Sequence, residues 1–505
     1  KSISQTLRFC TVIMMAVSPV FAVTHNVPDE FDSIQAGLDA SESGDTVLVQ
    51  AGTYVENLDW PTVNGIKLIA AGDSSNTFID GNHVDHVITM SSEGVIDTTT
   101  LVQGFTIRNG RIDDDNGGGI YCDWSSPTIS NCTISENYAF SHGGGIYCEG
   151  SSPTITNCTI TGNNVDYDGG GIYCDQSNPT INNCTITGNS ANHGGGICCL
   201  EGSSPTISNC TIRENLAFVG GGGICCLNGS NPTISNCTIT GNSVDYEWGV
   251  VGGGGICCSS SDPTISNCTI IGNSTDVYGG GIVCVEGSSP SISNCAVTDN
   301  TGEGIYVDSS CSAETNYSNI YNNSEGDFGG PDIDPDLGVI VDTNANGDSC
   351  DVYFNIFLAP MYVDPDNGDY HLQEDSPCID AGDPDSSLDP DGTIADIGAF
   401  YYDQDLFVPD FTGTELPGSY SISAAYPNPF NPSTNVTVSL PSASRLSVKV
   451  FNTLGQQVAA LANSTYDAGF HNFTFDGSGM ASDIYLVKAE VPGKMDEVRK
   501  VVLVK

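Results

Sequence analysis

Short alternations of apolar and polar positions, rather than a helical period, dominate the first 400 residues of the chain. The runs "GIYC", "PTI" and "CTI" each place apolar residues at every second position, and Gly, Ser, Pro or Asn residues separate them. A period of two, bounded by turn residues, is typical of short β-strands. The pattern therefore predicts an all-β region.

The three runs recur together as one repeating unit. Residues 143–163 read "GGGIYCEGSSPTITNCTITGN", and residues 169–189 read "GGGIYCDQSNPTINNCTITGN". The proline of each unit recurs at intervals of 26, 26, 26, 27, 31 and 27 residues, at Pro127, Pro153, Pro179, Pro205, Pro232, Pro263 and Pro290. Such a period predicts a β-solenoid. We expect a right-handed parallel β-helix with three short strands per coil, coils of about 26 residues, and a spacing of about 4.8 Å between coils.

Stacked coils convert each repeated position into a column. Two columns hold cysteines, Cys122 to Cys284 and Cys132 to Cys295, and we expect buried thiols, with disulfides between coils as the alternative. Two further columns hold asparagines, one beginning at Asn131 in the "NCT" runs and the other at Asn137. Stacked amides satisfy one another's hydrogen bonds, so both are expected to form ladders.

The chain divides into four segments by composition. Lys1 and Arg8 precede an apolar run that ends in Val-Phe-Ala, which predicts a signal peptide over residues 1–22. Residues 23–403 form the β-helix, with an amphipathic capping helix near its start and an Asp-rich C-terminal end. Residues 404–420 are a linker rich in Pro and Gly, and residues 421–505 alternate in the manner of a small β-sandwich. No segment after the signal peptide is apolar enough to be transmembrane.

Charge is concentrated in the β-helix segment. Residues 23–420 contain 56 acidic but only four basic side chains, whereas the whole chain has 62 and 13. Binding of phosphates requires Lys and Arg, so a nucleic-acid partner is excluded. Such an acidic surface instead attracts divalent cations, although a solubilising role accounts for most of the acids.

Calcium is the cofactor that the motifs favour. The run "DTNANGDSCD" spaces oxygen-bearing side chains at alternate positions, and the candidate ligands are Asp342, Asn344, Asn346, Asp348 and Asp351. The loop resembles those of EF-hand-like and thrombospondin-type repeats, but its twelfth position is Tyr353 rather than Glu. A weaker second group contains Asp389, Asp391 and Asp396. The alternative is an acidic edge without a bound ion.

Catalytic candidates are few. His142, Asp168 and His193 precede the GGG run in successive coils, which would bring them within reach of one metal ion or substrate, unless the loops scatter them. Arg213 is the one basic residue between positions 112 and 444, where a lyase would need a base. The outward stripe Tyr121, Tyr147 and Tyr173 could stack on sugar rings or simply cover the strands.

Two resemblances add to this picture. The runs "FDSIQAGLDASESGDTVLVQAGTYVEN", "GFTIRNG" and "YVDPDNGDYHLQEDSPCIDAGD" resemble secreted right-handed parallel β-helix proteins of the pectin-lyase-like superfamily, and the GGG-I and I-x-x-N elements resemble polymorphic outer-membrane protein repeats. The string "YPNPFNP", with "NTLGQQV" and "GSGMASDIY", is similar to type IX secretion C-terminal sorting domains. This second resemblance implies the type IX secretion machinery as a partner of residues 421–505, and release or display at the outer surface of a Gram-negative bacterium.

Two classes of function follow from the sequence. The main hypothesis is a non-enzymatic β-helix with a structural, binding or adhesive role, directed towards a polysaccharide or a cell-surface glycan. The alternative is a calcium-dependent polysaccharide lyase or glycoside hydrolase. The scarcity of basic residues and the lack of a repeated catalytic set favour the first.

Overall fold

The computed structural model describes residues 22–92, 94–245, 252–404, 417, 419–423, 425, 428, 430, 433–453 and 455–503. Nearly all of the expected signal peptide, most of the linker and part of the "YPNPFNP" string lie outside these residues. The chain divides into two compact units, residues 1–402 and 403–505.

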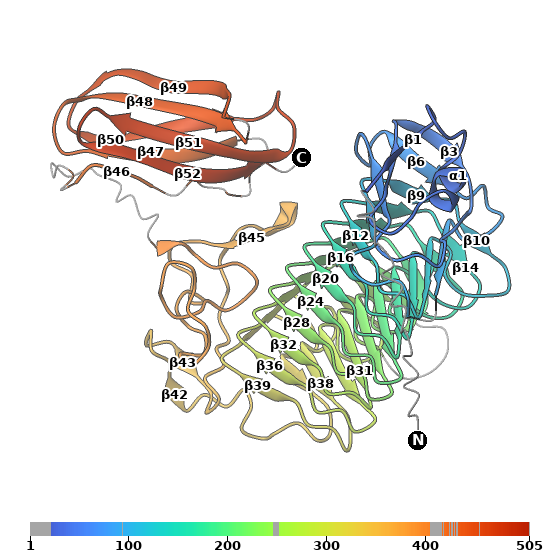
Figure 1. Ribbon diagram of the computed structural model, residues 1–505. Helices are drawn as coiled ribbons and strands as arrows, with labels where there is room; N and C mark the ends of the chain where they lie inside the picture. The colour runs from blue at the N-terminus through green and yellow to red at the C-terminus, as the bar shows by residue number, and fades with distance from the viewer. Residues whose placement is uncertain are drawn as a thin grey trace, which may run out of the picture. The chain divides into compact units, whose positions relative to one another are not determined.

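The first unit is a parallel β-helix whose strands pair in register from coil to coil (Figure 1). Sheet A collects the "PTI" runs and their equivalents. In stacking order, its strands are β1 (Thr24–Val27), β2 (Thr46–Val49), β5 (Lys67–Ala70), β8 (Leu101–Gln103), β12 (Thr128–Ser130), β16 (Thr154–Thr156), β20 (Thr180–Asn182), β24 (Thr206–Ser208), β28 (Thr233–Ser235), β32 (Thr264–Ser266), β36 (Ser291–Ser293) and β39 (Glu314–Asn316). The predicted fold class is confirmed.

The "CTI" runs form sheet B. Its strands are β3 (Gly52–Val55), β6 (Thr77–Asp80), β9 (Thr106–Arg108), β13 (Thr133–Ser135), β17 (Thr159–Thr161), β21 (Thr185–Thr187), β25 (Thr211–Arg213), β29 (Thr238–Thr240), β33 (Thr269–Ile271), β37 (Ala296–Thr298) and β40 (Asn319–Tyr321).

The "GIYC" runs form sheet C. Its strands are β4 (Leu58–Asp59), β7 (Ile88–Ser91), β11 (Ile120–Asp123), β15 (Ile146–Glu149), β19 (Ile172–Asp175), β23 (Ile197–Leu200), β27 (Ile224–Leu227), β31 (Ile256–Ser259), β35 (Ile282–Val285), β38 (Ile305–Val307) and β41 (Phe328–Gly329).

A fourth short sheet, beyond the three strands per coil that the alternation predicted, precedes the GGG runs. Sheet D contains β10 (Arg111–Ile112), β14 (Tyr138–Ala139), β18 (Asn164–Val165), β22 (Ser190–His193), β26 (Leu216–Gly220), β30 (Ser243–Val244) and β34 (Ser274–Thr275). Most of these strands are only two residues long, too short to show an alternation in the sequence.

The GGG run is required by the close approach of neighbouring coils. Gly143 adopts a left-handed φ of +68°, which disfavours any side chain. A Cβ on Gly144 would lie 2.7 Å from the carbonyl oxygen of Gly170, and one on Gly145 would lie 2.5 Å from that of Gly171. Because both contacts are to backbone atoms, no larger residue fits without separating the coils.

The interior of the solenoid is a continuous stack of isoleucine and cysteine side chains. The Ile column of sheet C is fully buried from Ile120 to Ile305, and both Cys columns are buried as well. Every cysteine among the described residues is a free thiol. The thiols act as small apolar groups, as expected.

Different elements close the two ends of the core. At the start, α1 (Ile34–Asp39) buries Ile34 and Leu38, and Ser33 caps it by accepting a hydrogen bond from the backbone N–H of Ala36. At the other end, Phe328, Ile333 and Phe357 pack on the core. Two small antiparallel pairs follow, β42 (Asp342–Thr343) with β43 (Ser349–Cys350) and β44 (Tyr362–Asp364) with β45 (Asp369–Leu372), the latter pair around η1 (Pro365–Asn367). Side chains of β43, β44 and β45 form a separate cluster with Ile271 and Ala296 of sheet B.

The second unit contains antiparallel sheets around its own core. One sheet consists of β46 (Ser421–Ile422), β47 (Ser433–Leu440) and β50 (Gly469–Asp476), and the other of β49 (Gln457–Tyr466), β48 (Ser444–Asn452), β51 (Asp483–Val491) and β52 (Met495–Leu503). Side chains from both sheets, such as Val438 and Val450, are buried in one cluster. This arrangement agrees with the predicted β-sandwich.

Candidate functional site

His142, Asp168 and His193 meet on one flank of the solenoid. Parallel backbone bridges pair His142 with Asp168 and Asp168 with His193, so the three side chains stand on consecutive coils. The Nδ1 atom of His193 lies 2.7 Å from Oδ1 of Asp168, and the Nε2 atom of His142 lies 3.5 Å from Oδ2. The loops differ in length, but the bridges in and beside sheet D keep the three positions aligned.

Asp168 is the centre of this cluster. Its side chain is only 17% exposed. Burial by itself raises the pKa of Asp168, but hydrogen bonds from His142 and His193, together with the charges of the two imidazoles, lower the pKa to about 2. The Nδ1 atom of His142 also lies 2.9 Å from Oδ1 of Asn116, on the preceding coil. Asp168 is therefore a carboxylate at neutral pH, and both of its oxygens have partners.

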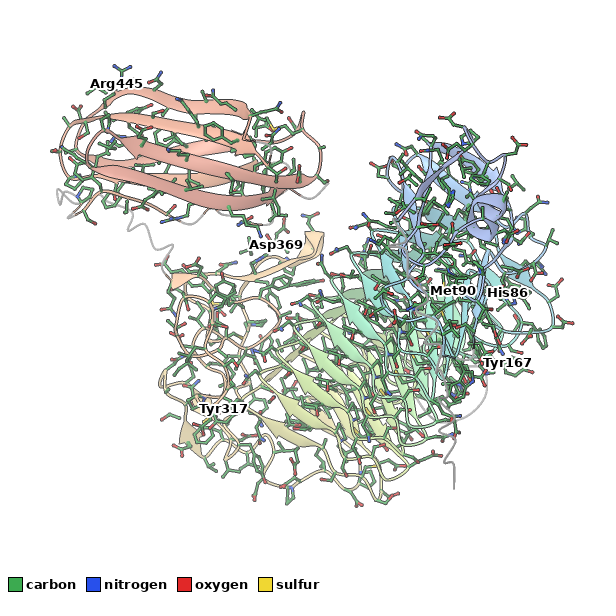
Figure 2. The ribbon with its side chains drawn as sticks, viewed as in Figure 1. His86, Met90, Tyr167, Tyr317, Asp369 and Arg445 are labelled. Atoms are coloured by element: carbon green, nitrogen blue, oxygen red, sulfur yellow. The ribbon has the colours of Figure 1, made fainter. Side chains whose placement is uncertain are left out.

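Two exposed aromatic side chains flank the cluster. Phe140 is 38% exposed and Tyr167 is 48% exposed, and their rings meet edge to face at 5.7 Å. Tyr167, labelled in Figure 2, also lies 6.0 Å from the ring of His142. Neither residue is among the candidates predicted from the sequence. In the sequence, they could have been found as aromatic residues that lie two or three positions before the GGG run in two adjacent coils.

Of the two roles considered for the tyrosine stripe, its packing agrees with coverage of the strands rather than with stacking on sugar rings. The rings of Tyr121, Tyr147 and Tyr173 stack nearly parallel, with centroids 5.2 and 5.5 Å apart. Tyr147 and Tyr173 are only 4% and 2% exposed, because each ring covers its neighbour and His142 packs on Tyr173 at 4.5 Å. The stripe is part of an outer apolar layer of sheet C, so its faces are not open to a sugar.

A column of carboxylates follows the tyrosines. Asp123, Glu149 and Asp175 are in register at the ends of β11, β15 and β19. The hydroxyl of Tyr147 donates a hydrogen bond of 2.9 Å to Glu149. Burial, followed by the charge of Glu149, raises the pKa of Asp175 above its usual value. All three carboxylate residues are half-buried.

Arg213 does not belong to the histidine cluster. It lies in β25 of sheet B, whereas His193 ends β22 of sheet D. Its guanidinium pairs with Glu214 at 3.0 Å and is largely exposed. A role for Arg213 as the base of a lyase stays a prediction without support from a neighbouring catalytic group.

The first candidate calcium loop uses its side-chain oxygens for its own backbone. Oδ1 of Asn344 accepts hydrogen bonds from the N–H groups of Asn346 and Asp348. Asp351 is fully buried, and its carboxylate accepts hydrogen bonds from the backbone of Gly338, Tyr353 and Asn355. Asp342 lies in β42, and Asn346 donates to the carbonyl of Ile379. The donor set therefore does not fit one cation, and calcium stays a prediction.

The carboxylates of the second acidic group also accept hydrogen bonds from the backbone. Asp396 accepts hydrogen bonds from the N–H groups of Asp380 and Tyr402, and Asp389 accepts one from Asp396. Burial raises the pKa of Asp389 to about 6 and that of Asp396 to about 7. Asp391 accepts hydrogen bonds from Thr393. Across the described residues, no group of three or more His, Cys, Asp or Glu side chains has an arrangement that could hold a metal ion.

The described part of the chain contains no helix with the length and apolarity needed to span a bilayer.

Parallel sheets closed into stacked coils, with asparagine and isoleucine columns, define the class of parallel β-helix proteins. The model of the family described as "right handed beta helix region" matches residues 62–212 and 170–357, more than half of the chain, and the chain belongs to this family.

The tail has its own match. The model of the secretion system C-terminal sorting domain covers residues 424–505. The protein is therefore exported, either released or retained at the outer surface, and the domain implies the type IX secretion machinery as a partner.

Comparisons with whole proteins are distant. The curated proteins give no match. The catalytic unit of a GH87 α-1,3-glucanase from Streptomyces thermodiastaticus is 14% identical, over 62% of this chain and 68% of that chain, with a TM-score of 0.35. A pectin methylesterase from Yersinia enterocolitica is 13% identical, over 65% of this chain and 94% of that chain, with a TM-score of 0.25. The enzymatically active domain of tailspike protein 4 from bacteriophage CBA120 is 12% identical, over 91% of this chain and 62% of that chain, with a TM-score of 0.25. Likenesses this weak carry no argument about function.

Proposed function

We propose that this exported β-helix protein binds a polysaccharide or cell-surface glycan on the flank formed by Phe140, His142, Tyr167, Asp168 and His193. The observation that carries the proposal is the contact of the exposed Tyr167 ring with His142 of a polar His–Asp–His cluster, with a second exposed ring, Phe140, packed on Tyr167. A sugar presents apolar ring faces and hydroxyl groups together. The aromatic rings suit the former, and the carboxylate and imidazoles suit the latter.

Binding is favoured over cleavage by the state of Asp168. Hydrolysis of a glycosidic bond needs a protonated carboxylic acid beside a second, ionised carboxylate. The low pKa of Asp168 makes it a poor proton donor at neutral pH, and both of its oxygens already have partners. These features suit a fixed hydrogen-bonding surface better than a general acid.

The first experiment measures retention of the full mature chain by affinity electrophoresis through gels that contain plant, algal or microbial polysaccharides. We expect one polymer to retard the protein, and Tyr167→Ala to weaken this retention roughly tenfold through loss of a stacking ring. The matched control is Tyr278→Ala. Tyr278 is also exposed, but it stacks on Tyr306 in a later coil. Equal losses in both variants, or retention by no polymer, would contradict the proposal.

A second candidate function rests on His193. Asp168 holds its Nδ1 atom at 2.7 Å, an arrangement that leaves Nε2 for proton transfer. A polysaccharide lyase or glycoside hydrolase activity is therefore worth testing with the same panel. New reducing ends that depend on calcium, and that disappear in His193→Gln, would favour this alternative over binding alone.

A further inference from the structure

The first strands of sheet D show how this flank accommodates a cation. Arg111 begins β10, and its guanidinium carbon lies 4.7 Å from the centroid of the Tyr138 ring on β14, its partner in register (Figure 1). The same guanidinium pairs with Asp113 at 2.8 Å. The face of an aromatic ring and a carboxylate both attract a cation. On these strands the chain therefore supplies its own cation to a ring and an acid.

The next coils repeat the ring and the acid but not the cation. Asp113, Phe140 and Asp166 directly follow the paired strands β10, β14 and β18, so they stand on consecutive coils. Asp166 is exposed, and the adjacent Tyr167 packs on Phe140. Residues 112–212 contain ten carboxylates and no Lys or Arg. The neighbouring coils therefore supply no guanidinium or ammonium group to the two exposed rings.

The histidine cluster does not reverse this balance of charge. Asp168 lies between the imidazoles of His142 and His193 and offsets their charge. Burial, followed by the charge of Asp166, raises the pKa of Tyr138, so the field of Asp166 extends across this part of the flank. A polymer of uronic acids would bring further carboxylates to an acidic surface and would be repelled. A cationic polymer would be attracted.

We propose that the glycan bound on this flank is a polymer of amino sugars with free ammonium groups. One ammonium group would lie beside Asp166 and against the ring of Tyr167, as the guanidinium of Arg111 lies on its own neighbouring ring. The inference rests on the proposed function, because it names the class of glycan for the same surface. It adds that charge complementarity, and not stacking alone, selects the ligand.

The test compares β-1,4-linked hexasaccharides that differ in one substituent. At C2 the glucosamine hexamer carries an ammonium, the N-acetylglucosamine hexamer an acetamide, and cellohexaose a hydroxyl. An α-1,4-linked galacturonate hexamer is the acidic probe. Titration calorimetry uses the full mature chain at a pH at which the sugar amines are protonated. We expect the glucosamine hexamer to bind about tenfold more tightly than cellohexaose, with an affinity that falls as salt increases, and the galacturonate hexamer to bind most weakly.

Variants separate this site from nonspecific attraction to an acidic protein. Asp166→Asn should weaken binding of the glucosamine hexamer about fivefold and leave cellohexaose unchanged, because only the ammonium interacts with the charge. Asp166→Lys should abolish binding of the glucosamine hexamer, because the chain then carries its own cation there. The matched control is Asp276→Asn. Asp276 is also exposed and follows β34 of sheet D, as Asp166 follows β18, but it lies several coils away.

The outcomes distinguish this inference from the proposed function. Equal affinities for the glucosamine hexamer and cellohexaose, both reduced by Tyr167→Ala, would overturn the inference and leave the glycan surface in place. Equal losses in Asp166→Asn and Asp276→Asn would also overturn it, since they would show general attraction to negative charge. Retention of the protein by no polymer in the gels would instead overturn the proposed function itself.

Discussion

Asp168 illustrates how stacking of coils sets the contacts and the pKa of a single side chain. In the sequence it is one acid among 62. In the fold it stands between two imidazoles presented by the coils before and after it, and this environment opposes the effect of burial on its pKa. The same geometry holds the histidines in fixed orientations, which a binding surface requires.

The low pKa of Asp168 predicts a loss of stability in acid. Its folded pKa, about 2, lies below the unfolded value of about 3.9, so its contribution is present above pH 4 and is lost as the pH falls from about 4 to 2. The free energy of unfolding should drop by about 2 kcal/mol more in the wild type than in Asp168→Asn over that range. Urea unfolding at several pH values measures it.

Asp113→Asn is the matched control for this acid titration, because Asp113 is an exposed carboxylate paired with Arg111. It should retain the pH dependence of the wild type. If Asp168→Asn also retained that dependence, the electrostatic account of the cluster would be wrong.

At the scale of single elements, the two asparagine columns have different roles. In the column from Asn137 to Asn323, each Nδ2 donates to Oδ1 of the next asparagine, and the whole column is buried. In the "NCT" column, Asn131 and its equivalents instead adopt a left-handed φ near +52° at exposed corners. An amide pair joins Asn183 to Asn157 there. The first column is therefore a structural ladder, and the second is mainly a set of turns.

Removal of one buried rung should be costly. Oδ1 of Asn215 accepts hydrogen bonds from the backbone and the Nδ2 of Asn189, and its Nδ2 donates to Ile186 and Asn242. Asn215→Ala leaves these buried groups without partners, so we expect a loss of about 3 kcal/mol in the free energy of unfolding. Asn236→Gly, at an exposed left-handed corner, should change it by only a few tenths of a kcal/mol. Comparable losses in both variants would contradict a special role for the ladder.

At the scale of the whole solenoid, each coil contacts mainly its two neighbours. Stability in such a repeat is approximately a sum over coils and the interfaces between them. The register supports this view, because Thr206 pairs directly with Thr233 and all four sheets advance by one strand per coil through this region. The long acidic segment thus behaves as an extendable framework that carries local sites.

Deletion of residues 206–232 should consequently yield a folded protein. The deletion removes one full coil and places Thr233 in the position of Thr206, next to β20. We expect a cooperative thermal transition by circular dichroism and unchanged glycan retention, because the histidine cluster is untouched. Deletion of residues 206–218 alone removes half a coil and should abolish the transition. An unfolded full-coil deletion would show that coupling extends beyond neighbouring coils.

The sequence by itself determined the fold, its period and its inward columns. Period-two alternation and a repeat of about 26 residues leave few other ways to bury Ile and Cys positions together. The sorting domain was likewise readable from its local motifs. These properties depend on patterns that repeat or lie close together in the chain.

The tertiary structure alone decided which individual side chains are accessible and which meet. Tyr147 and Tyr173 are buried because neighbouring rings and His142 cover them, and the sequence could not show this packing. The contact of Tyr167 with His142 depends on a lateral neighbour about 25 residues away in the sequence. Repetition fixes the columns, whereas the exceptions within them acquire a function only through three-dimensional contacts.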